Sequence, residues 1–327
     1  MKSFYISLGF AAMVKSQGFD FGVIDAAPVA VTTTLSIGAG STTIEYNSAT
    51  AIANVVADVS ANFISRNLSS KSALKNRLPA GKRDGSCNVQ PSGAGPVPSP
   101  DTPGAFLADP DFSSVAIDAQ TPSGFVRSSL NLRGSNSAYA SMGHTALDSY
   151  DSQTCANKCR AITGCMRSIS ISSATHLFCP DPPSTIVIKC VFWGGPVLNT
   201  NANNEGQWRS KFEIVIAGSN GYNTAGPFES PTGYTGIYLG EAAINAPNEC
   251  NSYMGVKIFT SSPFDPALCA AACSSQSDYN RANPYEDGNF QTCQFYNTYM
   301  LLKNGGSAQQ YCSLVLVTSK VFFILSC

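Results

Sequence analysis

Cysteine is the residue type of this chain with the widest choice of chemistry, because its thiolate can act as a nucleophile, bind a metal or be oxidised to a disulfide. The 327 residues include twelve cysteines but only two histidines, His144 and His176. A catalytic thiolate needs a histidine or another cation beside it, and zinc sites favour closely spaced cysteine and histidine pairs. Neither histidine stands in such a pattern, and we expect His144 to be a turn or surface residue. The even number of cysteines therefore predicts structural disulfides, with neither a metal nor a cofactor.

Carboxylate pairs are the second kind of reactive arrangement, and glycoside hydrolases can draw theirs from distant parts of a sequence. Glu205, in an asparagine-rich stretch, and Glu213, on a predicted strand, are the candidates for such a pair. The chain contains no Gly-x-Ser-x-Gly elbow, His-Glu-x-x-His helix, P-loop or dinucleotide-binding glycine motif. We therefore expect no catalytic residue and no enzyme activity, and we keep a glycoside hydrolase as the weaker alternative.

Aromatic residues near glycine and asparagine make binding the favoured class of function. Four of them are candidates for an exposed binding surface: Trp193, Trp208, Tyr222 and Tyr234. Sugar rings stack on exposed aromatic side chains that amide and carboxylate groups flank. A place in the core is the alternative for both tryptophans, because Trp208 begins an apolar face and Trp193 ends a strand that reads as buried.

Composition and the N-terminus favour an extracellular protein. Only 13 % of the residues are charged, against roughly 25 % in an average domain, and the net charge of -1 gives no field that would gather nucleic acid. Lys2 precedes an apolar run at residues 4–14, which is too short to span a membrane but suits a signal peptide. We therefore expect residues 1–17 to be the signal peptide of a secreted, extracellular or cell-wall protein without a transmembrane span.

Residues 18–83 contain no cysteine and end in the basic pair Lys82 and Arg83, the type of site that Golgi processing proteases cut. We interpret them as a removable pro-segment. Apolar residues inside it recur at helical spacing: Ile52, Val55, Val56, Val59 and Phe63. They predict an amphipathic helix that shields the maturing domain. The proline-rich residues 84–103 that follow predict an extended, semi-rigid arm.

A short pattern that occurs twice predicts the scaffold. In residues 150–159 and again in 264–273 an aromatic residue precedes an aspartate, and two cysteines follow four positions apart. The aspartate can cap a helix, and the spacing puts both sulfurs on one helical face. Each copy predicts a helix between strands, which makes an α+β unit. The first unit takes residues 104–196 and the second takes residues 250–316.

Strand and helix patterns divide these units further. The first unit should contain a strand at 124–132, a helix at 152–162 and a β-branched strand at 184–193, whereas residues 166–172 alternate weakly and predict a poorly formed strand. The second unit should contain a strand at 255–260, a helix at 265–275 and a strand at 293–302. Residues 197–249 predict a β-rich connecting section with one half-buried strand at 208–216, and residues 317–327 an atypical tail.

The cysteine pattern resembles that of PAN/apple domains, and the paired arrangement is similar to secreted PAN/apple-like proteins of filamentous fungi. A helix with Cys-x3-Cys, a third cysteine that enters a strand and a fourth on a later strand carry this resemblance, over residues 84–316. It implies two units, each an antiparallel sheet packed around one helix, with the disulfides Cys155–Cys190, Cys159–Cys165, Cys269–Cys312 and Cys273–Cys293. The cysteines without an implied partner are Cys87, Cys179, Cys250 and Cys327. A bridge from Cys87 or Cys179 to Cys250 would join the two halves.

The resemblance also implies a function, since PAN/apple modules recognise proteins or carbohydrates. We therefore expect an extracellular recognition protein whose partner is cell-wall polysaccharide or an extracellular protein. The alternative is a structural or effector-type secreted protein that has no small ligand.

Overall fold

The computed structural model describes residue 26 and residues 41–62, 93–165, 168–176, 184–209, 212–225, 228–239, 252–260, 262–302 and 308–316. Across these ranges the chain is α+β, with a larger and a smaller antiparallel sheet. The predicted signal peptide, the basic pair at 82–83, the tail at 317–327 and four of the cysteines (Cys87, Cys179, Cys250 and Cys327) lie outside the described residues. Among the helices of these ranges, none combines the length and the apolar run that a membrane span requires.

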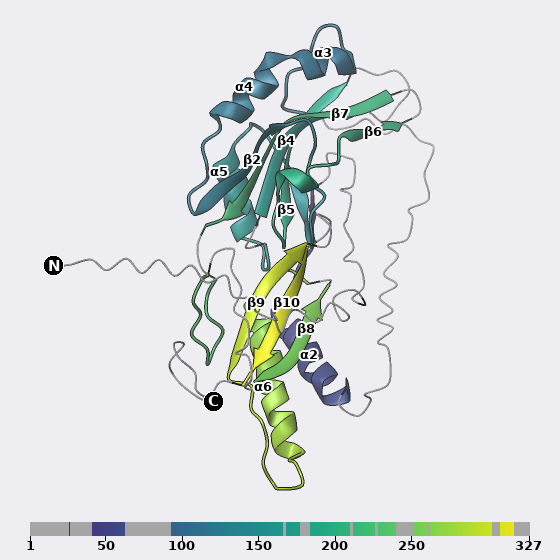
Figure 1. Cartoon of the computed structure of the whole chain (residues 1–327). Coiled ribbons are helices and arrows are strands. Elements are labelled where there is room, and N and C mark those ends of the chain that lie inside the picture. The colour runs from purple at the N-terminus through teal and green to yellow at the C-terminus, as the bar shows by residue number, and fades with distance from the viewer. Residues whose placement is uncertain are drawn as a thin grey trace, which may run out of the picture.

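The larger sheet lies above the smaller one in Figure 1. Its strands follow the spatial order β1 (Thr42–Thr43), β3 (Ser141–Leu147), β5 (Thr185–Trp193), β4 (Ser168–His176), β7 (Phe212–Thr224) and β2 (Phe125–Leu132), with β6 (Gly206–Arg209) paired to the start of β7. The β-branched and aromatic residues of β5 form the predicted strong strand, which is buried along nearly its whole length.

Strand β4 corrects the prediction for residues 166–172. It is a full strand that pairs with β5 on one side and with β7 on the other. Ile169 and Ile171 are fully buried in the core beneath a helix, while the indole of Trp193 lies on the opposite face and donates a hydrogen bond of 3.4 Å to the Ser170 hydroxyl. Two flanking strands therefore stabilise a serine-rich segment whose own pattern is weak.

The predicted single strand at 208–216 is also wrong. Strand β6 ends at Arg209, and β7 returns antiparallel to it from Phe212, so that Trp208 lies opposite Glu213. The remainder of β7 pairs with β4 and β2, which makes residues 206–224 part of the larger sheet and not of a connecting section.

Three helices cover the larger sheet: α3 (Pro103–Ala108), α4 (Pro110–Asp118) and α5 (Ser152–Arg160). Proline opens both α3 and α4 behind the capping side chains of Thr102 and Asp109. The described part of the proline-rich arm is held against the sheet, since Gly95 forms a bridge with Ile186 and the Asp101 carboxylate accepts a 2.7 Å hydrogen bond from the Ser184 amide.

The smaller sheet has the order β8 (Tyr253–Phe259), β10 (Ala308–Val315) and β9 (Phe295–Leu302). Helix α6 (Pro266–Ala282) packs on it and extends further than the predicted 265–275. This part matches the expected sheet around one helix, whereas the larger sheet carries three helices and extra strands.

Both repeat helices begin at the predicted aspartates. Asp151 and Asp265 accept hydrogen bonds from backbone amides of the first turn. All four disulfides that the resemblance implies are present: Cys155–Cys190, Cys159–Cys165, Cys269–Cys312 and Cys273–Cys293. The described cysteines are therefore oxidised, which is consistent with an oxidising compartment.

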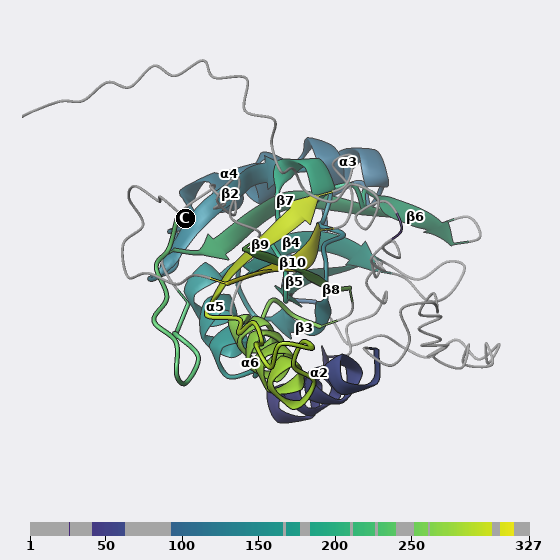
Figure 2. The same ribbon diagram turned by 60° about the horizontal axis from the view of Figure 1, so that its bottom comes forward.

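Helix α2 (Ser48–Asn62) confirms the helix predicted inside residues 18–83. It lies beside α6 in both views (Figures 1 and 2). Val55 and Val59 are buried against α6, but Val56 is 42 % exposed and belongs to the outer face. Phe63 lies outside the described residues.

Candidate functional site

The four aromatic residues expected to form a binding surface are not brought together. Trp193 and Tyr222 are 0 % exposed, so their prediction as ligand-binding residues is wrong. Trp193 ends the central strand β5, and Tyr222 lies on β7 with its hydroxyl accepting a 3.1 Å hydrogen bond from the Asn220 amide. Gly221 lies within β7, between β4 and β2, and Gly194 follows the end of β5 with Pro263 close against it, where the sequence suggested open turns.

Trp208 is the exposed member of the set, with 66 % of its surface accessible. It stands on the short strand β6, whose one partner among the described strands is the start of β7. The half-buried Glu213 lies directly opposite it, so the two side chains share one face of the strand pair. Glu205 and Gln207 are exposed on the same stretch. Gln207, the neighbour of Trp208 on the strand, faces the other side of the strand pair. An indole with the Glu213 carboxylate beside it can stack on an apolar ring face and bind hydroxyl groups at the ring's rim.

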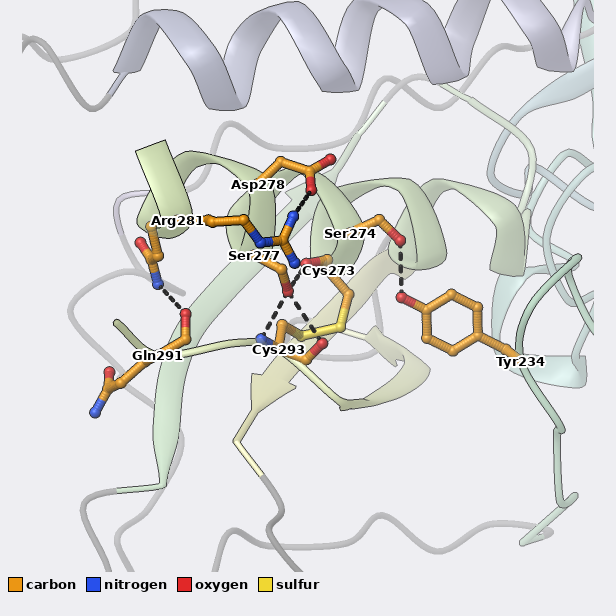
Figure 3. A network of polar contacts seen from close by, with 9 residues as sticks. Tyr234, Cys273, Ser274, Ser277, Asp278, Arg281, Gln291 and Cys293 are labelled. Carbon is orange, nitrogen blue, oxygen red and sulfur yellow. Dashed lines mark hydrogen bonds and ion pairs between the residues drawn. A yellow bond between two sulfur atoms is a disulfide. The ribbon is translucent and has the colours of Figure 1, made fainter. Parts of the chain in front are cut away.

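Tyr234 belongs to a different surface. Its ring is half-buried and lies 5.0 Å from the ring of Tyr296, and its hydroxyl shares a 3.0 Å hydrogen bond with the Ser274 hydroxyl of α6 (Figure 3). Burial and, next, the nearby Tyr234 raise the pKa of the Tyr296 hydroxyl to about 12. Tyr234 therefore anchors its segment to α6 and adds nothing to the Trp208 surface.

Residues 228–239 present apolar side chains that sequence reasoning missed. Phe228 packs against Phe264 with ring centroids 5.1 Å apart, and beyond the anchor at Tyr234 the segment exposes 79 % of Ile237 and 60 % of Tyr238. The sequence signal for this surface is the apolar run at residues 237–239, which lies between two glycines. The run contains no polar residue, so it lacks the alternation that would turn its apolar side chains toward one buried side.

The cysteine-rich end of α6 is a structural network, as Figure 3 shows. The Ser277 hydroxyl accepts a 2.9 Å hydrogen bond from the Cys293 amide and lies 3.1 Å from the Cys273 carbonyl oxygen. These bonds join the helix to the segment that leads into β9, beside the Cys273–Cys293 disulfide. The groups are all engaged with one another and supply no reactive thiol or hydroxyl.

The remaining candidates for chemistry are dispersed. His144 was expected at a turn or on the surface, but it is 2 % exposed on β3, with its ring Nδ1 3.0 Å from the Thr42 hydroxyl. Of the residues that the structure describes, no three His, Cys, Asp or Glu side chains gather as metal ligands would. Glu205 and Glu213 keep the hydrolase alternative open as a prediction.

No family model matches the chain, and the searches of curated proteins and of solved structures found no similar protein. Membership of the PAN/apple family therefore stays a prediction, which rests on the resemblance of the cysteine pattern.

Proposed function

We propose that the protein is a secreted recognition protein that binds extracellular polysaccharide through the face of Trp208. The exposed indole carries the proposal. With 66 % of its surface open to solvent, the indole is accessible for stacking on the face of a sugar ring. The face that Trp208 shares with Glu213 combines a flat apolar ring with a hydrogen-bond acceptor.

The contribution of the indole to the binding free energy follows from the area that a sugar ring would cover. Covering about 80 Å² of the indole with a sugar ring would contribute about 2 kcal/mol at about 25 cal/mol per Å². This corresponds to a factor of roughly 30 in affinity for each polysaccharide site. A single stacking residue therefore supports weak binding of one polysaccharide chain.

Two further features support an extracellular role. The four disulfides suit a protein that matures in the secretory pathway. We also propose that the two repeat helices belong to PAN/apple-like units, since each carries the cysteine pattern and the bridges that this resemblance implies. In this view the bridged helices are scaffold, and β6 with β7 is the binding addition to the first unit.

Retention on insoluble wall polysaccharides tests the proposal. The Trp208→Ala variant should bind roughly 30-fold more weakly than the unchanged protein. Tyr238→Ala is the matched control, because this side chain is similarly exposed at 60 % on another segment. Equal retention of the unchanged protein and Trp208→Ala would overturn the assignment.

A protein ligand is the second candidate, and the exposed Ile237 and Tyr238 favour it. Loss of binding in Tyr238→Ala with normal binding in Trp208→Ala would favour this candidate over polysaccharide. A structural or effector-type role without a ligand would leave both variants unchanged on every polysaccharide and protein surface tried.

A further inference from the structure

Residues 41–62 bind to both units of the fold, although the sequence reads as a removable pro-segment. Their first contact is with the larger sheet. Thr42 and Thr43 pair with His144 and Gly143 of β3, and the hydroxyl of Thr42 lies 3.0 Å from the His144 ring. The backbone continues this pairing, since the Ile44 amide donates a 3.1 Å hydrogen bond to the Met142 carbonyl oxygen.

The larger sheet is shaped for this strand. Gly143 has a φ of +102°, and a Cβ atom at this position would collide with the Thr42 carbonyl oxygen. Gly164 has a φ of +88°, and its Cβ would lie 2.9 Å from the Cβ of Tyr46. Two glycines in the left-handed region therefore leave the space that the N-terminal segment fills.

The second contact is with the N-terminus of α6. The Asp265 carboxylate that caps this helix also accepts a 2.9 Å hydrogen bond from the Tyr46 hydroxyl and a 2.7 Å hydrogen bond from the Ser48 hydroxyl. Only two residues lie between Thr43 and Tyr46, so the segment passes directly from one unit to the other.

The third contact is the apolar face of α2. Val55 is 8 % exposed and Val59 0 %, and they pack with Leu268 and Ala272 of α6. At the edge of this contact the Asp58 carboxylate lies 3.5 Å from the Lys257 ammonium group.

The two repeat helices differ at the positions that face α2. In the first repeat the counterparts of Leu268 and Ala272 are Thr154 and Lys158, one residue before each cysteine. Thus α6 has a second apolar face, next to the face that carries its cysteines, and α2 covers it. The second repeat therefore has an apolar helix face that residues 41–62 cover, whereas the first repeat has polar residues at the corresponding positions.

We propose that residues 41–62 stay bound when the chain is cut after Arg83, so that the processed protein consists of two chains. Lys82 and Arg83 follow residue 62 and precede residue 93 in the sequence, outside the described residues. A cut there removes none of the contacts described above. The N-terminal chain then braces the two units as a permanent subunit, in contrast to a pro-segment that departs.

Controlled cleavage of the full chain tests this proposal. A recognition sequence for a site-specific protease is inserted after Arg83, the folded protein is cut completely, and native mass spectrometry and size-exclusion chromatography follow. We expect one species that contains both fragments in a 1:1 ratio. Separation of the N-terminal fragment at micromolar concentration would overturn the proposal.

Paired variants show whether the assigned face holds the fragment. After the cut, Val59→Ala should raise the dissociation rate of the N-terminal fragment roughly 10- to 30-fold, because a buried contact with α6 is lost. Val56→Ala is the control on the same helix, since Val56 is 42 % exposed. Equal dissociation rates for the two variants would show that another surface holds the fragment and would overturn the assignment. The mild alanine changes keep both uncut proteins folded, which near-UV circular dichroism checks.

Discussion

Alanine at Asp265 should destabilise the protein more than alanine at Asp151, although both residues cap the corresponding helix of their repeat. The two carboxylates are comparably placed, since each is half-buried and each binds the first turn of its helix. Asp265 additionally accepts hydrogen bonds from the hydroxyls of Tyr46 and Ser48. The difference between the two variants therefore measures how firmly the N-terminal segment is held.

The expected loss of unfolding free energy in each variant follows from the hydrogen bonds that its aspartate accepts. Removal of an aspartate cap costs about 1 kcal/mol. Loss of the Asp265 acceptor leaves the hydroxyls of Tyr46 and Ser48 unpaired, and loss of the Asp151 acceptor leaves the hydroxyl of Thr154 unpaired, at about 1 kcal/mol each. Asp265→Ala should therefore lower the free energy of unfolding by about 3 kcal/mol and Asp151→Ala by about 2 kcal/mol. Hydrogen bonds from Thr154 also lower the pKa of the Asp151 carboxyl, so its contribution is lost as the pH falls into the acid range.

Urea denaturation followed by near-UV circular dichroism measures both losses. A double-mutant cycle isolates the Tyr46 bond, because Tyr46→Phe should cost about 1 kcal/mol in the unchanged background and close to nothing beside Asp265→Ala. Equal losses for the two aspartate variants, or a Tyr46→Phe effect that persists without Asp265, would refute the reasoning.

Two further predictions concern the scaffold. Alanine at both cysteines of the Cys155–Cys190 bridge should cost about 4 kcal/mol of unfolding free energy, against about 2 kcal/mol for Cys159–Cys165, because their sequence separations are 35 and 6 residues; equal shifts in urea denaturation would contradict the loop-length argument. Burial raises the pKa of the Tyr139 hydroxyl, so the folded state disfavours its ionised form. The free energy of unfolding should not depend on this group below about pH 10 and should fall above it. Urea denaturation between about pH 10 and 11.5 should therefore show a shallower fall in that free energy for Tyr139→Phe than for the unchanged protein. An equal slope for the two proteins would contradict this prediction.

Local patterns were sufficient for the repeat helices. The aspartate caps and the Cys-x3-Cys spacing define where α5 and α6 begin and which face meets the sheet, and both depend only on neighbours in the sequence. The bridge partners came from the resemblance to PAN/apple domains, since spacing alone leaves many pairings open. All four implied bridges are found.

Strand pairing decided what the residue pattern could not show. Residues 208–216 read as one strand with an apolar face, but the chain reverses and pairs Trp208 with Glu213. This reversal moves the indole from the expected apolar face to an exposed position. Trp193 is the opposite case, because β3 and β4 enclose the strand that it ends. The burial of Trp193 depends on strands distant in sequence, and the exposure of Trp208 depends on a chain reversal between Arg209 and Phe212, so propensity and alternation do not distinguish the two tryptophans.

The two repeats share their scaffold and differ where a partner can bind. The shared positions are the capping aspartates and bridged cysteines, and each makes its shared contact inside its own unit. Asp265 additionally binds Tyr46 and Ser48 of the N-terminal segment. The differences are the Leu268 and Ala272 face of α6, which the N-terminal segment covers, and the β6–β7 strand pair with its exposed Trp208, which has no counterpart among the described strands of the smaller sheet. Both copies of a duplicated unit need the residues that fold it, so these residues are shared. A residue that is present in one copy alone is expected to make a contact outside the repeat. For Leu268 that contact is Val59, and for Trp208 it is the ligand that we propose.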